Sequence, residues 1–409
     1  MLLDAILPLF LLSALALTLS VLFYLLKPRP SKIKPHCTTL QKILHLRSLH
    51  NSPTFSTTFL GKKLFHITSY DSALKLLSDK AAGTDKGFNY MHFSPLFGKS
   101  SIFTLSLPLW SSNRKQINKH VFSKTCTLPL DDLIASALKN RLSNLPLHTP
   151  LKILPILQKV TLEIIYQYTT ANSLYSVHSL SSVESYILAL MSLRVTLLKT
   201  SKDWRYYVMP SFLYRFTCLG SEVYSASLTV RSFIEKAFEF AKPDSIINSL
   251  TATSKEYRID QLSTLLFAGT DTSAASTSWW MLLFPEDSCD LAHQIKEAGR
   301  LKPVAPMIVR YVDKAIECDG VEVKGSVVIW LNAISLSTDS EVQFGIGKRS
   351  CPGREVGNKI VRGLAGWLRE RYEWKVRNIE EEDGEDGFTY VPGRGGEIII
   401  SSNRAHKLG

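Results

Sequence analysis

One cysteine near the C-terminal end lies in a loop whose residues suit a metal-binding thiolate. The loop runs from Phe344 to Gly353 and contains Cys351, Arg349 and three glycines. Glycine permits positive φ angles and a close approach of the backbone to a flat partner. The cation at Arg349, nearby backbone N–H groups and the helical pattern that follows all favour an ionised sulfur at Cys351. Such a thiolate is a good ligand for a soft or haem-bound metal.

Five residues of this loop form a specific pattern. Phe344, Gly347, Arg349, Cys351 and Gly353 occupy the positions that define the cysteine-ligand loop of the haem-thiolate monooxygenases, so the chain resembles the cytochrome P-450 family. The resemblance implies that Cys351 binds the iron of haem b and that the other four residues surround the cofactor. The alternative is a structural cysteine buried after a turn.

A second segment, from Ile259 to Leu283, is mostly apolar and predicts one long buried helix. Its centre is Ala268-Gly269-Thr270-Asp271-Thr272, which resembles the run that crosses the oxygen-binding face of the haem in this family. The resemblance implies that Ala268 and Gly269 lie against the cofactor, that Thr272 hydrogen-bonds dioxygen and that Asp271 relays protons. The alternative for Thr272 is a structural hydroxyl that returns to the preceding turn.

Cations for the two haem propionates are expected from separate parts of the chain. Trp110 and Arg114 are four residues apart and share one helical face. By the resemblance this pair meets a propionate, and Arg310 and Arg349 add further positive charge. Unpaired carboxylates beside an apolar cofactor would be costly, so these arginines would neutralise them.

Two supporting segments of the family are missing. Between Thr272 and Glu297 there is no room for two further helices, and Asp339 is followed almost directly by Phe344. Glu297 and Arg300 can pair on one helical face, and they resemble a structural pair whose third partner lies in the second missing segment. We therefore expect a buried pair that is partly unsatisfied. An incomplete gene model, a degenerate copy and a compact variant are the competing explanations.

The composition is that of a globular protein with surplus positive charge. The chain has 409 residues, of which 45% are hydrophobic, and a formal net charge of +12. Because no aromatic and basic nucleic-acid motif accompanies this charge, a membrane surface or an acidic protein is the expected partner, and nucleic acid is not. The six cysteines contain no C-x-x-C pair, which argues against a disulfide framework and a zinc module.

The N-terminal region predicts a membrane anchor. Residues 1–26 contain an uncharged apolar run, Ala5 to Leu26, that is long enough to span a bilayer. A basic, proline-rich linker follows at 27–35, and its charge predicts that this side is cytoplasmic. By the resemblance, residues 36–409 form a single haem domain on the endoplasmic reticulum membrane. A cleaved signal peptide is the alternative.

The expected fold is mainly α with a smaller β part. It is a cytochrome P-450 fold that is incomplete between the central helix and the cysteine loop. Residues 36–60 are expected to be helical and then extended, with hairpin turns at Gly61 and at Asp319-Gly320 and a short helix from Asp71 to Asp79. Residues 81–109 are expected to form a long loop, with four aromatic candidates for the pocket lining: Phe88, Tyr90, Phe93 and Phe97.

These features together imply a haem-dependent monooxygenase that inserts one atom of O2 into a lipophilic small molecule. The resemblance implies that an NADPH-dependent flavoprotein reductase supplies the electrons. The alternative is a catalytically inactive relative that binds haem poorly or only associates with the membrane.

Overall fold

The computed structural model describes residues 39–78, 85–86, 88–123, 130–251, 253–285, 290–338, 342–377, 384–385, 387–393 and 396–402. The chain divides into two units, Met1–Lys42 and Ile43–Gly409. Apart from the first residues of helix α2, every element discussed below belongs to the second unit. The expected anchor at 1–26 and linker at 27–35 lie outside the described residues.

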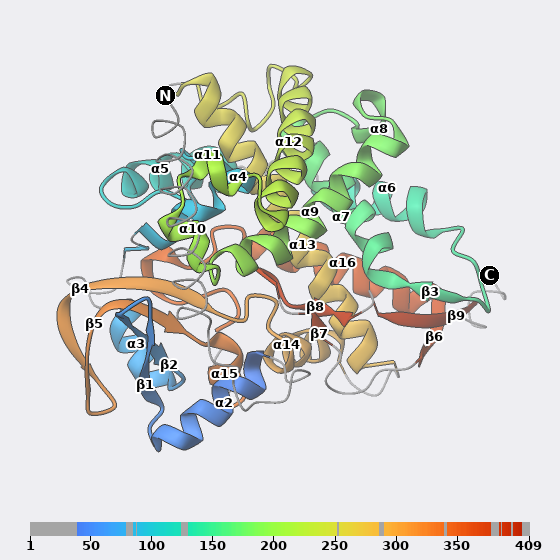
Figure 1. Ribbon diagram of the computed structural model, residues 1–409. Coiled ribbons are helices and arrows are strands. Elements are labelled where there is room, and N and C mark those ends of the chain that lie inside the picture. Colours follow the sequence, from blue (N-terminus) through green and yellow to red (C-terminus); the bar gives the residue numbers. More distant parts are fainter. Residues whose placement is uncertain are drawn as a thin grey trace, which may run out of the picture. The chain divides into compact units, whose positions relative to one another are not determined.

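The fold is mainly helical with small sheets, as the sequence predicts (Figure 1). The α-helices are α2 (Thr39–His50), α3 (Tyr70–Ser78), α4 (Ser94–Phe97), α5 (Leu109–Ile117), α6 (Leu130–Leu142), α7 (Ile153–Thr170), α8 (Leu174–Val177), α9 (Leu180–Thr200), α10 (Trp204–Val208), α11 (Ser211–Tyr214), α12 (Cys218–Glu239), α13 (Lys255–Leu283), α14 (Leu291–Leu301), α15 (Leu331–Ser335) and α16 (Arg354–Arg371). Short turns of other helix types are η1 (Phe88–Phe93), η2 (Asn118–Phe122) and η4 (Gly347–Arg349).

The strands form three small antiparallel or mixed sheets. The largest has the order β1-β2-β5-β4, and the others are β3-β9-β6 and β7-β8. The strands are β1 (Thr54–Phe59), β2 (Lys62–Ile67), β3 (Pro150–Lys152), β4 (Ile308–Cys318), β5 (Val321–Ile329), β6 (Tyr372–Arg377), β7 (Gly384–Glu385), β8 (Val391–Pro392) and β9 (Glu397–Ser402).

Both predicted hairpins are confirmed at their turns. Leu60 and Gly61 have φ angles of 49° and 74°, and Asp319 and Gly320 have φ angles of 49° and 76°. Two successive positive φ angles are the signature of a type I′ turn, which matches the twist of the flanking strands. The second hairpin brings Arg310 of β4 opposite Val327 of β5 and so fixes the position of one of the expected propionate-binding cations.

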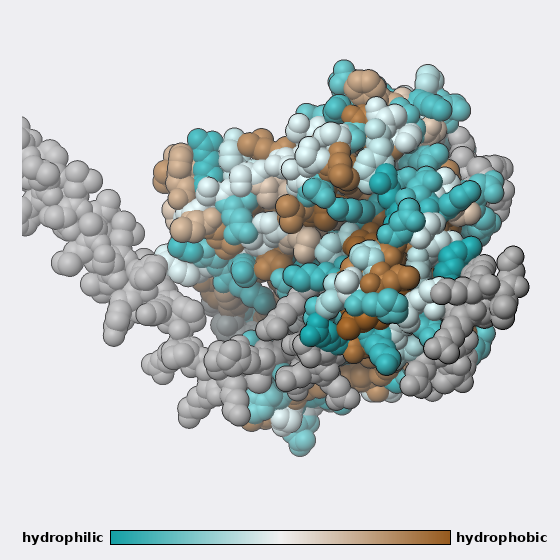
Figure 2. All heavy atoms as spheres, turned by 90° about the vertical axis from the view of Figure 1, so that its right-hand side faces the viewer, coloured by the Kyte–Doolittle hydropathy of each residue, from teal (hydrophilic) through white to brown (hydrophobic). Residues whose placement is uncertain are grey.

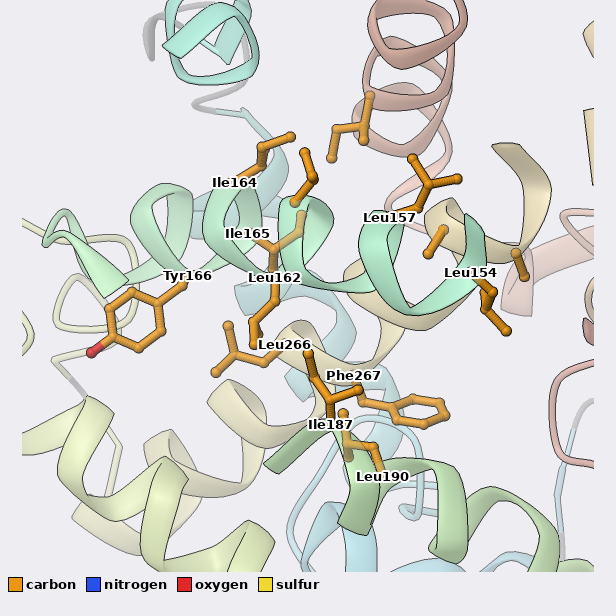
Figure 3. Close-up of a cluster of buried hydrophobic side chains, with 14 of the residues drawn as sticks. Leu154, Leu157, Leu162, Ile164, Ile165, Tyr166, Ile187, Leu190, Leu266 and Phe267 are labelled. Carbon is orange, nitrogen blue, oxygen red and sulfur yellow. The ribbon is translucent and has the colours of Figure 1, made fainter. Parts of the chain in front are cut away.

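The predicted central helix is confirmed as α13, which begins at Lys255 because Ser254 caps it. The Ser254 hydroxyl accepts the backbone N–H of Tyr257 at 3.1 Å, which satisfies one of the free donors at the helix start. This helix packs on α7, whose side chains are buried on nearly all sides. Figure 3 shows Leu162 and Ile165 of α7 directed toward Leu266 of α13. The core of the molecule lies around this helix pair.

The expectation of one long loop over 81–109 was wrong in part. Residues 88–97 form η1 and α4, and Pro95 lies in the first turn of α4, where proline is well tolerated. Tyr90, Phe93 and Phe97 are buried, so burying their rings outweighs the weak helical signal of the sequence. The side chain of Phe88 lies outside the described residues.

One described helix, α9, is long and apolar enough to cross a membrane by length and composition alone, and half of its apolar window is buried inside the protein. Core helices of globular proteins pass the same test. On the face shown in Figure 2, hydrophobic residues are interleaved with hydrophilic ones.

Three histidines are held neutral by burial. The pKa values of His66, His92 and His178 are each lowered from 6.5 to about 4, chiefly because burial disfavours the charged ring. The ring of His178 is 2% exposed and stacks on Phe233 with 3.9 Å between ring centroids. Neither of its nitrogens has a hydrogen-bond partner within the part of the chain that the structure describes.

We expect acid to destabilise the fold through these histidines. Between pH 6.5 and about 4 the unfolded chain binds more protons than the folded chain, so stability present above this range is lost as the pH falls. One such group changes the free energy of unfolding by up to about 1.4 kcal/mol per pH unit. Urea unfolding across this range should show a shallower pH slope for His178→Phe. The neighbouring Tyr166→Phe, which removes a buried hydroxyl without a titrating ring, should keep the wild-type slope; equal slopes in all three proteins would contradict the prediction.

Candidate functional site

A cavity of about 330 Å³ brings the expected site residues together. Its walls come from α13, α5, β4, the segment 343–352 and the start of α16. The lining includes most of the expected residues: Trp110, Arg114, Ala268, Thr272, Arg310, Phe344, Arg349 and Cys351. The fold thus brings together residues that are far apart in the sequence. Trp110 and Cys351, which are more than 240 positions apart, line the same cavity.

The cysteine loop is closed by its own backbone. The N–H of Cys351 donates to the carbonyl of Phe344 at 2.8 Å, and the N–H of Ser350 donates to Gly347 at 3.0 Å. Gly347 has a φ of 74°, and a Cβ atom there would lie 2.4 Å from the carbonyl oxygen of Leu77. Only glycine fits that position, for both conformational and steric reasons.

Gly353 is under less constraint than Gly347. A Cβ atom at Gly353 would lie 3.5 Å from the ring of Phe122, which is ordinary van der Waals contact. Its contribution is its backbone N–H, which hydrogen-bonds the Cys351 sulfur. Gly353 also precedes α16, so the thiol lies at the start of that helix.

The expectation that its surroundings ionise Cys351 was wrong for the chain without metal. The side chain is accessible from the cavity, yet the surrounding protein desolvates it, and burial raises the pKa of the thiol. The Gly353 N–H and the charges of Arg114 and Arg354 oppose this shift without cancelling it. Arg349 is not among these charges, although it is nearer in sequence than Arg114. A bound metal ion would supply the missing charge, because metal binding deprotonates a cysteine ligand.

Arg114 of α5 binds the loop, and Arg349 extends from the loop toward Trp110 and Asp85. Arg114 donates from Nη2 to the carbonyl of Ser350 at 2.8 Å. The Arg349 side chain is 3% exposed and lies 3.4 Å from Asp85. Its guanidinium also covers the Trp110 ring at 4.0 Å from the centroid. Trp110 therefore contacts Arg349 more closely than Arg114, whose guanidinium is 6.0 Å from the ring.

Two further cations, Arg310 and Lys86, line the cavity with Arg114 and Arg349. Arg310 is 4% exposed and donates to the carbonyl of Val309 at 2.8 Å. Lys86 donates from Nζ to the carbonyl of Phe103 at 2.7 Å. Burial, followed by the charges of Arg310, Arg349 and Arg114, lowers the pKa of Lys86 well below its usual range.

We refer to Lys86, Arg114, Arg310 and Arg349 as the cation wall. Burial also lowers the pKa of Arg349 to about 10. The Nε atoms of Arg310 and Arg349 are buried and have no hydrogen-bond partner among the described residues. Buried donors of this kind normally have partners, and Asp85 is the acid nearest to Arg349. Among the described residues the cation wall therefore has more positive than negative charge, and two of its donors have no acceptor.

A haem group fits this donor set. Its two propionates would supply two negative charges and four acceptor oxygens to the cation wall, and its iron would meet the Cys351 sulfur. The cavity between them is lined mainly by apolar side chains. The orphaned Nε atoms of Arg310 and Arg349 are the observation on which this fit rests.

The central residues of α13 face different neighbours. Ala268 and Thr272 line the cavity. The Thr272 hydroxyl donates to the carbonyl of Ala268 at 2.6 Å. This is the bond to the preceding turn that is expected if the Thr272 hydroxyl has a structural role. Gly269 faces α7, because a Cβ atom there would lie 2.6 Å from the side chain of Ile165. Asp271 is 2% exposed and lies behind the cavity wall.

The Glu297–Arg300 pair differs from the expected buried and unsatisfied pair. The guanidinium donates to both carboxylate oxygens, at 2.8 Å and 2.6 Å, and a third bond of 3.1 Å reaches the carbonyl of Ser335 in α15. The Arg300 side chain is 25% exposed and the Glu297 side chain is 29% exposed. Partial exposure and the Ser335 carbonyl therefore make this pair less costly than a buried one. The hydrogen bond to Arg300 lowers the pKa of Glu297.

Aromatic rings form the apolar side of the cavity. Tyr90 and Phe97, two of the expected lining residues, line it together with Phe103, Phe267 and Phe388. The rings of Phe97 and Phe103 are 4.4 Å apart, and those of Phe103 and Phe388 are 5.1 Å apart. Phe93 does not line the cavity but packs on Phe388 at 5.0 Å.

Lys86 and Thr389 are among the polar residues of the cavity that sequence reasoning missed. Lys86 carries no motif and is recognisable only after folding places it beside Arg310 and Arg349. Thr389 lines the cavity from a short segment near the C-terminus and hydrogen-bonds Asp271. No spacing rule connects residues so far apart in the chain.

Similarity to plant sequences is partial. Cytochrome P450 81Q32 of Catharanthus roseus is 28% identical over 185 residues, covering 31% of this chain and 37% of the relative. Cytochrome P450 81F1 of Arabidopsis thaliana is 26% identical, covering 33% and 39%, and an isoflavone 2'-hydroxylase of Glycyrrhiza echinata is 25% identical, covering 36% and 41%. The chain spans at most 41% of the length of these three relatives, and no family model matches it.

The fold is shared with a solved structure. Retinoic-acid-bound cyanobacterial CYP120A1 is similar with a TM-score of 0.66 at 15% identity, covering 88% of this chain and 94% of that chain. At this identity the comparison concerns the fold, and the plant relatives supply the sequence link. In its fold and in about a third of its sequence, the chain is similar to members of the cytochrome P450 family.

Proposed function

We propose that the protein is a haem-thiolate monooxygenase that acts on a lipophilic small molecule. The observation that carries the proposal is the cavity that places Cys351 on the same chamber as a cation wall short of negative charge. A cysteine ligand and partners for two carboxylates are what a haem-thiolate site requires. When bound, haem supplies the activation of O2 that inserts one oxygen atom into a C–H bond and releases the other as water.

The chain's own residues would hold this cofactor from two sides. Cys351 would bind the iron, with the Gly353 N–H directed at the sulfur to limit its charge. Arg114, Arg310 and Arg349 would bind the propionates. Their burial keeps water away, so each charged hydrogen bond would be stronger than at the surface.

The substrate would lie among the aromatic rings. Phe97, Phe103, Phe267 and Phe388 line the cavity and exclude water from it, which favours apolar ligands. Ala268 offers a small side chain on the helix wall, and Thr272 offers a hydroxyl oxygen beside it. These positions suit contact with dioxygen and substrate.

Electrons would come one at a time from an NADPH-dependent flavoprotein reductase. Arg349 is too deeply buried to dock such a partner, with only 3% of its side chain exposed. Lys348 is exposed beside it and remains available to an acidic surface. The apolar run from Ala5 to Leu26 supports anchoring in the endoplasmic reticulum membrane.

A second candidate is a catalytically inactive relative. The observation that favours it is the short path from Leu283 at the end of α13 to Leu291 at the start of α14, where the described residues form no further helix. Such a chain would retain the fold but bind haem weakly.

The spectrum of the CO complex separates these two candidates. Because a cysteine thiolate donates electron density to iron, the reduced, CO-treated protein should absorb at the red-shifted Soret position typical of haem-thiolate proteins. Cys351→Ala should abolish this band, and Cys218→Ala, which changes an exposed cysteine on α12, should keep it. A conventional haem spectrum in the wild-type protein, or none, would rule out the monooxygenase.

Each arginine of the cation wall should contribute to haem binding through a propionate. Arg310→Met should lower the affinity for haem by about 100-fold, because removing one partner of a buried charged pair costs several kcal/mol. Quenching of tryptophan fluorescence during haem titration would measure it. Haem dimethyl ester, which has no carboxylates, should bind the variant and the wild-type protein almost equally.

The exposed Arg215→Met serves as the control, and it should leave both affinities unchanged. In the cofactor-free chain Arg310→Met should also raise the midpoint of thermal unfolding, because it relieves repulsion with Lys86 and Arg349. Equal losses of affinity for haem and its ester would show that Arg310 does not contact a carboxylate.

A further inference from the structure

Asp271 and Thr272 are adjacent in sequence but cannot serve the same space. Successive residues on an α-helix are about 100° apart around its axis. Thr272 lines the cavity, whereas Asp271 is not among the residues that line it. The Thr272 hydroxyl proton is already engaged with the Ala268 carbonyl at 2.6 Å. A direct link from Asp271 through Thr272 to the cavity is therefore absent from the described structure.

The carboxylate of Asp271 has two hydrogen-bond donors. Gln158 of α7 donates from Nε2 to Oδ1 at 2.8 Å, and Thr389 donates from Oγ1 to Oδ2. Asp271 is 2% exposed, and it forms no ion pair with the described residues. A buried carboxylate is costly without such donors, so both bonds fix its orientation.

Thr389 is the donor that also reaches the cavity. It is 2% exposed overall, and it lines the cavity beside Phe388. Gln158 is on the opposite side and does not line it. The Thr389 hydroxyl is thus placed between the carboxylate and the chamber.

The segment that carries Thr389 is held on three sides. The N–H of Phe388 donates to the carbonyl of Arg194 in α9 at 2.9 Å, and the N–H of Tyr390 donates to Val304 at 2.8 Å. Trp279 of α13 donates from its indole N–H to the carbonyl of Tyr390 at 3.1 Å. These bonds hold the backbone of this segment, and with it the Cα atom of Thr389, beside Asp271.

We infer that Thr389 is the positioning residue that connects Asp271 to the cavity and passes its proton inward. The inference rests on the proposed function. Insertion of one oxygen atom from O2 consumes two electrons and two protons and forms one water. The electrons come from the reductase, and the protons come from solvent through Asp271. The Thr389 hydroxyl releases a proton into the cavity and takes one from the protonated carboxyl group.

The contact itself is testable in the cofactor-free chain. The infrared bands of the Asp271 carboxyl group can be isolated as the difference between wild-type protein and Asp271→Asn, with 13C-labelled aspartate. Thr389→Val, which removes the donor at nearly constant volume, should shift these bands. Thr389→Ser and Thr272→Val should not. A shift with Thr272→Val and none with Thr389→Val would overturn the inference.

The functional arm compares two oxygen donors on an alkoxycoumarin that the wild-type protein oxidises. Thr389→Val should lower the O2- and NADPH-driven rate at least about 10-fold, because positioned proton transfer contributes this much or more. Turnover driven by hydrogen peroxide should stay near the wild-type rate, because peroxide brings both protons and both electrons. Thr389→Ser should restore the O2-driven rate.

The control is Thr229→Val, which makes the same change at an exposed threonine of α12 that does not line the cavity, and both of its rates should stay near wild type. An equal loss of both rates in Thr389→Val would show a merely structural residue, and an unchanged O2-driven rate would show that protons enter elsewhere. If the wild-type chain oxidises no probe, the proposed function fails, and the infrared arm alone decides whether Thr389 holds Asp271.

Discussion

Burial of positive charge around one cavity is the constraint on which the site depends. Arg310 and Arg349 are almost fully buried, and each keeps an Nε donor without a partner among the described residues. Protein interiors rarely tolerate such groups without compensation. The carbonyls that do bind them, at Val309 and Leu105, belong to separate segments, so β4 and the stretch before α5 must both be in place. A ligand with two carboxylates would complete what the chain leaves open.

The packing of α13 on α7 decides how the central residues are used. Gly269 lets the two helices approach until Ile165 occupies the space of a side chain. That contact sets the rotation of α13 and turns Asp271 toward Gln158. Ala268 and Thr272 then face the cavity. Gly269, which the sequence placed beside a flat cofactor, thus contacts α7 instead. Asp271 accepts its hydrogen bonds from Gln158 and Thr389, which lie on other segments.

The motifs beside the two short connections, before Glu297 and before Phe344, keep ordered hydrogen bonds. Arg300 donates to the carbonyl of Ser335, and partial exposure of the Glu297–Arg300 pair reduces the cost of the expected missing partner. The Cys351 loop is likewise closed by its own backbone bonds to Phe344 and Gly347. Local hydrogen bonding therefore preserves both motifs although the chain spans less than half of its plant relatives.

The sequence by itself determined the features that depend on local spacing. The hairpin turns at Gly61 and Asp319, the central helix and the glycine at 347 follow from φ preferences and periodicity, which are properties of neighbouring residues. Tertiary structure alone decided the electrostatics. Burial raises the pKa of Cys351 against its nearby cations, and desolvation depends on atoms from every element around the cavity. The positions of Lys86 and Thr389 were equally beyond the sequence, because their partners are brought near only by the packing of distant segments.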